Sequence, residues 1–305
     1  MSDVSSALVD LQLFALVGGL ALAAGWDARA REVPDRLWQV VAGVGALLGA
    51  LLLAGQGPGV VLLWLFVAGF ALQHLFSWEE HWEAASPRLL GLVDAVLYVR
   101  TGAVLLAAAW EYGVGGGGVP LSIVAVYVTV LTARGLFEAR ILYGGADAKA
   151  VIVVAVVLPL WATPLLVGSP TLTPILEVIP FALTVLVNAA VLTLLVPIAL
   201  AIRNARRGEL SFPKGFLGMS IPTDELPARY VWAHDPSLDQ DHPPDDVATS
   251  AEDRQLRVRQ AAELRARGVE RVWVSPQVPM VLFLALGAGL GLLVGNLVLD
   301  LVAIL

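Results

Sequence analysis

The sequence contains no cysteine, which excludes disulfides, thiolate catalysis, cysteine-ligated zinc and iron–sulfur clusters. Charged residues are also scarce, at 15% of the 305 residues, whereas 58% are hydrophobic. The mean hydropathy of +0.78 is far above that of a soluble globular domain. The formal charge of −7 comes mostly from one polar region toward the C-terminal end, and it argues against nucleic acid as a partner. We therefore expect a membrane protein whose first partner is membrane lipid.

Long apolar runs dominate the chain. A helix needs roughly 20 apolar residues to cross a hydrocarbon core about 30 Å thick. Backbone groups in lipid must hydrogen-bond within their own segment, so each run is expected to be helical and the fold class all-α. We expect a polytopic bundle of about eight transmembrane helices. Seven is the alternative count if the fourth run, which begins near Asp94 and Arg100, is interfacial. The runs cover residues 8–25, 37–54, 58–76, 95–112, 118–136, 150–168, 180–202 and 279–305.

The arginines predict the orientation. Arg29, Arg31 and Arg36 follow the first run, and short basic loops face the cytoplasm. Counting runs from there predicts a multi-pass protein of the plasma membrane with a cytoplasmic polar insert before the last helix. The expected domains are a transmembrane bundle over 1–202, the acidic insert over 203–277 and a final transmembrane helix over 278–305. Within the insert, we expect loop or disorder over 224–253. A helix is expected over 252–271, either at the bilayer surface or as a solvated connector.

Two short motifs contain the candidate site residues. The first runs from Asp27 through Ala28-Arg29-Ala30-Arg31-Glu32-Val33 to Pro34 and Asp35, just where the first apolar run ends. Alone, it also fits a basic cytoplasmic loop in which an aspartate pairs with an arginine. The second is Tyr143-Gly144-Gly145-Ala146-Asp147-Ala148-Lys149, at the start of the sixth run. Its glycines permit a tight turn beside the carboxylate, although a plain turn with an aspartate at a helix N-terminus also fits.

The predicted topology puts Asp27 and Asp147 on the same side of the membrane and at similar depth. Two carboxylates brought close together in a medium of low dielectric constant cannot both ionise easily, so such a pair shares a proton. The ionised member can activate a water, and the protonated member can hydrogen-bond the carbonyl that the water attacks. This pattern predicts an aspartic protease. Asp94 is a weaker candidate carboxylate, which we expect to pair locally with Arg100.

The segment from Asp27 to Pro34 resembles the first-aspartate motif of type IV prepilin peptidases, and archaeal ones in particular. The segment from Gly144 to Lys149 resembles their second motif, Gly-x-Gly-Asp, with Ala146 in place of the second glycine. The resemblance implies a catalytic dyad of Asp27 and Asp147. Gly144, Gly145, Lys149, Arg31 and Pro34 are expected as supporting or substrate-binding residues.

The same resemblance implies the activity. It predicts an endopeptidase that removes a short basic leader from prepilin or preflagellin (archaellin) precursors at the cytoplasmic membrane face. Because the cysteine-bearing zinc loop of bacterial members is absent, we expect peptidase activity without methylation. No cofactor is expected. No metal is expected either, because His74 and His81 lack partners at metal-ligand spacing. Glu79, Glu80 and Glu83 could attract a basic leader or simply form a solvated loop.

Other functions compete with this one. The main alternative is an ion- or proton-coupled transporter in which Asp27, Asp94, Asp147 and Asp300 form a path through the membrane. A structural membrane subunit would leave the two motifs as coincidence. A presenilin-like protease ranks lower, because its first aspartate is expected inside a span rather than before a basic loop.

Overall fold

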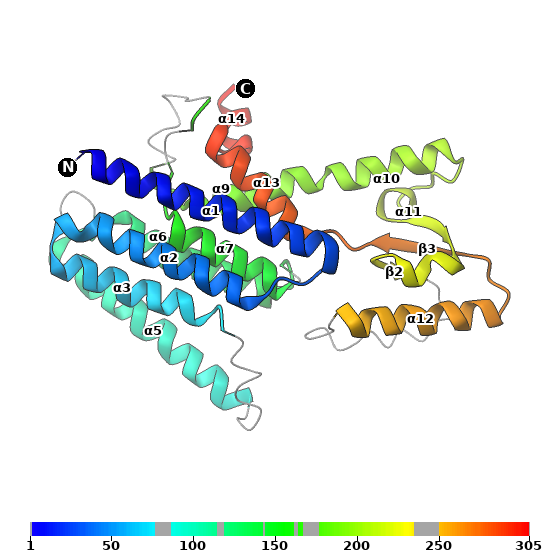
Figure 1. The fold of residues 1–305 in the computed structure, drawn as a ribbon, viewed down its shortest axis with the longest axis horizontal. Coiled ribbons are helices and arrows are strands. Elements are labelled where there is room, and N and C mark those ends of the chain that lie inside the picture. The colour runs from blue at the N-terminus through cyan, green and yellow to red at the C-terminus, as the bar shows by residue number, and fades with distance from the viewer. Residues whose placement is uncertain are drawn as a thin grey trace. The chain divides into compact units, whose positions relative to one another are not determined.

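A computed structural model describes residues 2–76, 87–114, 119–142, 144–161, 164–166, 177–234 and 250–304. Most of these residues are helical (Figure 1). The helices are α1 (Ser2–Ala30), α2 (Asp35–Leu53), α3 (Pro58–Gln73), α5 (Pro87–Tyr112), α6 (Leu121–Glu138), α7 (Gly145–Val157), α9 (Phe181–Thr193), α10 (Leu195–Arg206), α11 (Lys214–Leu217), α12 (Ser250–Ala266), α13 (Met280–Leu293) and α14 (Leu297–Ile304). Two 3-10 helices, η1 (Ala54–Gln56) and η2 (Thr223–Ala228), and three strands, β1 (Met219–Pro222), β2 (Val231–Ala233) and β3 (Arg271–Pro276), complete the set.

The chain forms two compact units. Unit 1 comprises Met1–Trp26, Val33–Ala189 and Met280–Leu305, and unit 2 comprises Asp27–Glu32 and Ala190–Pro279. The short segment Asp27–Glu32 therefore packs with the later part of the chain, although the residues on either side of it belong to unit 1. The three domains expected from the sequence stay a prediction. The two units are defined differently, by how the residues pack.

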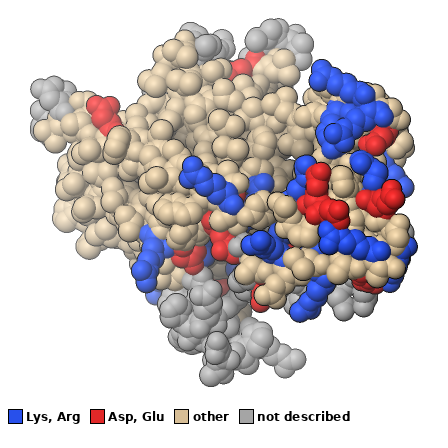
Figure 2. Space-filling model, turned by 45° about the vertical axis from the view of Figure 1, so that its right-hand side comes forward, with Lys and Arg blue, Asp and Glu red and all other residues tan. Residues whose placement is uncertain are grey.

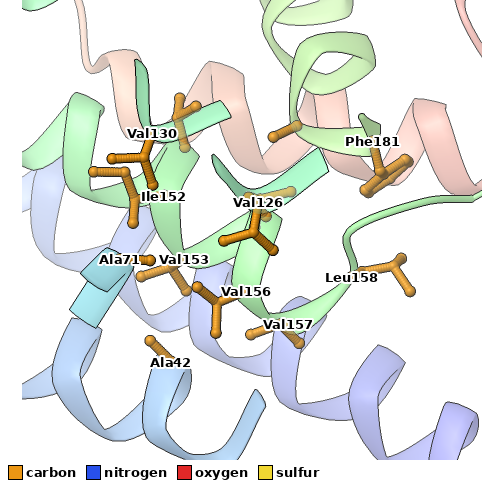
Figure 3. Packing of buried hydrophobic residues seen from close by; sticks show 14 of the residues in the cluster. Ala42, Ala71, Val126, Val130, Ile152, Val153, Val156, Val157, Leu158 and Phe181 are labelled. Atoms are coloured by element: carbon orange, nitrogen blue, oxygen red, sulfur yellow. The ribbon is translucent and has the colours of Figure 1, made fainter. Parts of the chain in front are cut away.

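The core of unit 1 is built around α7. The eight residues of α7 from Ala150 to Val157 are all buried, so this part of the helix has no exposed side. Figure 3 shows Val153 and Val156 of α7 among side chains of the neighbouring helices, such as Ala42 of α2 and Val126 of α6. Small residues let the backbones approach closely, because a Cβ added at Gly45 of α2 would lie 2.8 Å from the Cα of Val157. The hydrophobic α7 is thus held firmly, with its N-terminus as the one polar end.

Five described helices are long and apolar enough to cross a membrane, which indicates a membrane protein. They are Val4–Ala30, Asp35–Gln56, Gly91–Tyr112, Leu121–Glu138 and Phe181–Arg206. The expected eight spans are not confirmed. The fourth run, expected to be the weakest, is one of the five. Helices too short to cross a membrane form in the runs at 58–76, 150–168 and 279–305.

The short helices have local causes. Helix α7 ends because Leu158 precedes Pro159, and the proline ring pushes the preceding residue out of the helical region, to φ −138° and ψ 81°. The last run is broken at Gly295, whose φ is 110°, and Asn296 then caps α14 by accepting from the backbone N–H groups of Val298 and Leu299 at 3.2 Å each. Helix α3 has 16 residues, between Gly57 and a turn at His74.

Asp94 and Arg100 do not pair with each other. Asp94 lies 3.9 Å from Arg134 of α6, and the Arg100 guanidinium lies 4.9 Å from the centre of the Phe66 ring of α3. Residues six apart lie on different faces of a helix, which explains why the expected local pair does not form. Glu79, Glu80, Glu83 and His81 lie outside the described residues.

Unit 2 contains a small antiparallel sheet that an all-α prediction missed. The strand order is β1-β3-β2, with Ser220 opposite Trp273 and Trp232 opposite Ser275. Helix α12 (Ser250–Ala266) overlaps the helix expected over 252–271, but it packs on the sheet, with Ala261 and Leu264 against Val272 and Val274. The expected loop over 224–253 is wrong in part, because η2 and β2 occupy its first residues and α12 begins before its end. Residues 235–249 lie outside the described part of the chain.

Candidate functional site

The second motif forms the polar N-terminus of α7. Gly144 precedes the helix in an extended conformation, and its carbonyl accepts from the backbone N–H groups of Asp147 and Ala148 at 3.0 and 3.3 Å. The Asp147 carboxylate folds back over Gly144, because a Cβ added there would lie only 2.8 Å from Asp147 Oδ2. A carboxylate in the first turn is stabilised by the helix dipole. Gly144 is therefore the residue that leaves room for this carboxylate. Tyr143 lies outside the described residues.

The two other residues before Asp147 differ in role. A Cβ added at Gly145 meets nothing within 4 Å, so this glycine is not required for space. Ala146, which replaces a glycine of the family motif, packs its methyl group against the core of unit 1. Of the two glycine positions in this turn, only Gly144 requires a glycine for space.

An ion pair joins the ends of the two motifs within unit 1. Lys149 Nζ donates to Asp35 Oδ1 at 2.6 Å, from the first turn of α7 to the first turn of α2. The two side chains are 18% and 32% exposed, so the pair is partly shielded from water. Pro34 is the N-cap residue of α2 and holds the chain extended just before Asp35. Residues 114 positions apart in the sequence are therefore brought together at one end of the buried helix α7.

This ion pair should contribute measurably to stability. In a double-mutant cycle with Asp35→Asn and Lys149→Gln, we expect a coupling free energy of about 1 kcal/mol, measured by denaturant unfolding in detergent. The exposed pair Asp224–Arg265 in unit 2 is the matched control, with an expected coupling below roughly 0.5 kcal/mol. Equal coupling for both pairs would contradict a special role for the link between the motifs.

Residues Asp27–Glu32 of the first motif lie in unit 2. Asp27 is in the last turn of α1 and is only 8% exposed. Helix α1 ends at Arg31, whose φ of 59° is left-handed and whose N–H donates to the Asp27 carbonyl at 3.0 Å. The Tyr230 hydroxyl donates to the Arg29 carbonyl at 2.8 Å, and the Arg31 guanidinium lies 5.2 Å from the Tyr230 ring centre. Tyr230 therefore contacts the end of α1 twice, directly after the buried carboxylate.

Charges around this segment are partly buried. Burial lowers the pKa of the Arg31 guanidinium, while the nearby Asp27 carboxylate and Tyr230 raise it in part. Arg257 of α12 lies 5.4 Å from the same Tyr230 ring, and burial lowers its pKa as well. Both guanidiniums remain protonated at neutral pH, because an arginine starts from a very high pKa. Asp27 thus has a half-buried positive charge close by.

Sequence reasoning predicted some of these residues and missed others. Gly144, Asp147 and Lys149 lie together in unit 1, and Asp27 and Arg31 lie together in unit 2. The pairing of Asp27 with Asp147 stays a prediction. Asp35 and Tyr230 were not singled out. Asp35 had a detectable signal, since it directly follows Pro34 in the first turn of an apolar helix. Tyr230 had none, because it lies in a polar segment far from either motif.

The fold defines the broad class: a mainly α-helical protein with five membrane-length helices among its described residues and a small α/β unit. Comparison of the chain with protein-family models, curated proteins and solved structures found no match. The resemblance to prepilin peptidases therefore rests on the two motifs alone. Among the described residues, no group of three or more His, Asp or Glu side chains is arranged to hold a metal ion.

Proposed function

We propose that this protein is a membrane-embedded aspartic endopeptidase that removes the short basic leader from prepilin or preflagellin precursors. One observation carries the proposal. The Asp35–Lys149 ion pair joins the end of the first motif to the end of the second, at the N-terminus of α7, whose residues 150–157 are all buried. The buried Asp27 carboxylate adds support, since a charged group is rarely buried without a function or a partner.

The proposed chemistry uses two aspartates. In this mechanism the ionised member of the Asp27–Asp147 dyad takes a proton from a water as its oxygen attacks the scissile carbonyl carbon. The protonated member donates a hydrogen bond to the carbonyl oxygen, where negative charge develops. When the carbon–nitrogen bond breaks, a proton passes to the leaving amine, and the dyad returns to its starting state with one shared proton. The water supplies the hydroxyl of one product and a proton of the other.

The proposed substrate fits the predicted orientation of the first motif. A basic leader would lie on the cytoplasmic side and the following apolar helix in the membrane, so that the scissile bond lies at the interface. Arg29 and Arg36 are exposed next to this motif, as the positive-inside rule requires for a cytoplasmic loop.

The test of this function is cleavage in membranes. The protein is co-expressed with a panel of basic-leader, pilin-like substrates, and the products are separated by size and sequenced from the new N-terminus. We expect cleavage at the junction of leader and apolar helix. If no substrate of the panel is cut although the protein inserts in normal amounts, the proposed function is wrong.

Tyr230 is a proposed positioning residue for Asp27, because it contacts the backbone of Arg29 and the side chain of Arg31. Tyr230→Ala is expected to lower kcat by about 10-fold with little change in KM, since a shift of the catalytic group affects the chemical step. Tyr230→Phe keeps the ring and should lose less. Trp232→Ala, at an exposed position two residues away, is the control and should be unchanged. A KM effect without a kcat effect would refute positioning.

A transporter is the second candidate, and one feature favours it. The last apolar run is broken between α13 and α14, as in transporters with discontinuous helices. The buried Asn188 donates to the Gly295 carbonyl at 2.9 Å and accepts from the Leu297 N–H at 3.0 Å across this break. Because these bonds satisfy the freed backbone groups, the break also fits a packing role. Transport predicts that Asp300→Asn abolishes function, whereas the peptidase predicts no effect on cleavage.

A further inference from the structure

An exposed apolar cluster follows the end of α10 in unit 2. Phe212 is 88% exposed and Leu217 is 62% exposed, and Leu210 and Phe216 are also exposed. The rings of Phe212 and Phe216 lie edge to face, with their centres 6.0 Å apart. Four large apolar side chains within eight residues form a contiguous patch of the kind that marks an interaction site. We call residues 207–217 the interfacial turn.

The interfacial turn is held in place by buried polar contacts. The side chain of Asn204, on the last turns of α10, is fully buried and donates to the carbonyls of Gly215 and Gly218 at 2.8 and 2.7 Å. The Ser275 hydroxyl of β3 donates to the Leu217 carbonyl at 2.8 Å. Asn204 and Ser275 thus fix both ends of α11. These hydrogen bonds fix the backbone that carries the two phenylalanines, so their exposure does not result from a loose loop.

Positive charge surrounds the apolar cluster. Arg203, Arg206 and Arg207 end the helix before it, and Lys214 lies within it. The one acidic residue of the turn, Glu209, lies 3.8 Å from Arg271. In Figure 2 most of the Lys and Arg side chains in view lie toward the right, with Asp and Glu side chains among them. Exposed phenylalanines among arginines and lysines are the composition of a surface that binds anionic lipid.

The length of the preceding helix gives the depth of the turn. The membrane-length helix Phe181–Arg206 has 26 residues. At about 1.5 Å per residue it extends roughly 39 Å, against a hydrocarbon core of about 30 Å. Its C-terminal arginines therefore reach the headgroup region, and the residues that follow begin there. A solvent-exposed aromatic pair at this depth has acyl chains within reach.

We infer that the interfacial turn inserts Phe212, Phe216 and Leu217 into the boundary between lipid headgroups and acyl chains, while Arg206, Arg207 and Lys214 bind anionic headgroups. The partner is the bilayer surface. This contact anchors unit 2 through the face of β3 that carries Trp273 and Ser275. Val272 and Val274 alternate with them and face α12, so α12 lies across the sheet from the turn. The inference is independent of the proposed peptidase activity.

The absence of native cysteine makes this testable by site-specific labelling. Phe212→Cys and Leu217→Cys are each labelled with an environment-sensitive fluorophore in nanodiscs that contain phosphatidylglycerol. A nitroxide at carbon 5 of the lipid chain is the quencher. Val258→Cys, exposed on α12, is the control. We expect lipid nitroxides to quench the labels at 212 and 217 several-fold more strongly than the label at 258, and aqueous iodide to show the reverse order.

A second arm tests the charges. In nanodiscs of neutral lipid only, or with Arg206→Gln, Arg207→Gln and Lys214→Gln combined, quenching at 212 by the lipid nitroxide should fall. Equal quenching in neutral and anionic bilayers would overturn the electrostatic part of the inference. Equal quenching at all three labelled positions, in protein that unfolds like the unlabelled chain, would overturn the anchor itself.

Discussion

Asp27→Asn and Asp147→Asn are each expected to lower cleavage of a basic-leader substrate by at least about 100-fold, the usual contribution of a group that transfers protons in the transition state. Asparagine keeps the size and shape of aspartate but can neither accept the proton of the attacking water nor share a proton with its partner. The measurement is the rate of appearance of the trimmed substrate in membranes that contain equal amounts of each variant. The double variant should be no worse than either single variant, because the two groups act as one unit.

Two matched controls separate catalysis from stability. Asp10→Asn changes an exposed aspartate on the same helix as Asp27, and Asp300→Asn changes an aspartate in the first turn of α14, as Asp147 is in α7. Both control variants should cut at the wild-type rate. If Asp27→Asn or Asp147→Asn retains more than about half of the activity, the dyad is refuted, because loss of a general acid or base cannot be so mild.

Gly144→Ala is expected to lower kcat by roughly 10- to 100-fold while leaving the protein folded, since displacement of a catalytic group by about 1 Å can cost this much. The added methyl would lie 2.8 Å from Asp147 Oδ2, so the carboxylate must move away. The carboxylate is the far end of a rotatable side chain, so it can move without a shift of the backbone. The backbone is not strained either, because the φ of Gly144 is −97°. The measurement pairs initial cleavage rates with thermal unfolding.

Gly145→Ala is the control for this prediction. It changes the next residue, where a Cβ meets nothing within 4 Å and where alanine suits the helix better than glycine. Its cleavage rate should match that of the wild type. Equal activity of both alanine variants would show that the position of the Asp147 carboxylate above Gly144 does not matter to the reaction. Unfolding of Gly144→Ala at a much lower temperature would instead make the glycine a structural requirement.

The helices could be predicted from hydropathy, but their lengths could not. Lipid-length apolar runs such as 37–54 and 118–136 became α2 and α6 nearly as expected. The run at 150–168 became a 13-residue helix, because Pro159 stops it. A hydropathy average over many residues gives proline no more weight than any other residue. Its steric effect on the preceding residue nevertheless ends the helix. The same reason applies at Gly295, where one left-handed residue divides the last run.

The sheet of unit 2 was beyond sequence reasoning for another reason. Strands β1 and β2 have four and three residues, too few to show alternation. Strand β3 does alternate, with the buried Val272 and Val274 between the more exposed Arg271, Trp273 and Ser275, but it directly follows a helical pattern that obscured it. Within the candidate site, the motifs around Asp27 and Asp147 could be found from the sequence because the residues of each motif are adjacent in the chain. Tyr230 contacts Arg29 across 201 positions, and no local pattern reports such a contact.

The most direct test of the central claim is the proximity of the two aspartates in the membrane. Because the chain has no cysteine, Asp27→Cys with Asp147→Cys gives one possible intramolecular disulfide. A disulfide requires Cα atoms within about 7 Å, as expected for two carboxylates that share a proton. Mild oxidation should shift the double variant on a non-reducing gel, while Asp10→Cys with Asp147→Cys stays unshifted. If both cysteines react with maleimide but neither oxidation nor a short bifunctional reagent links them, the two-aspartate account is contradicted.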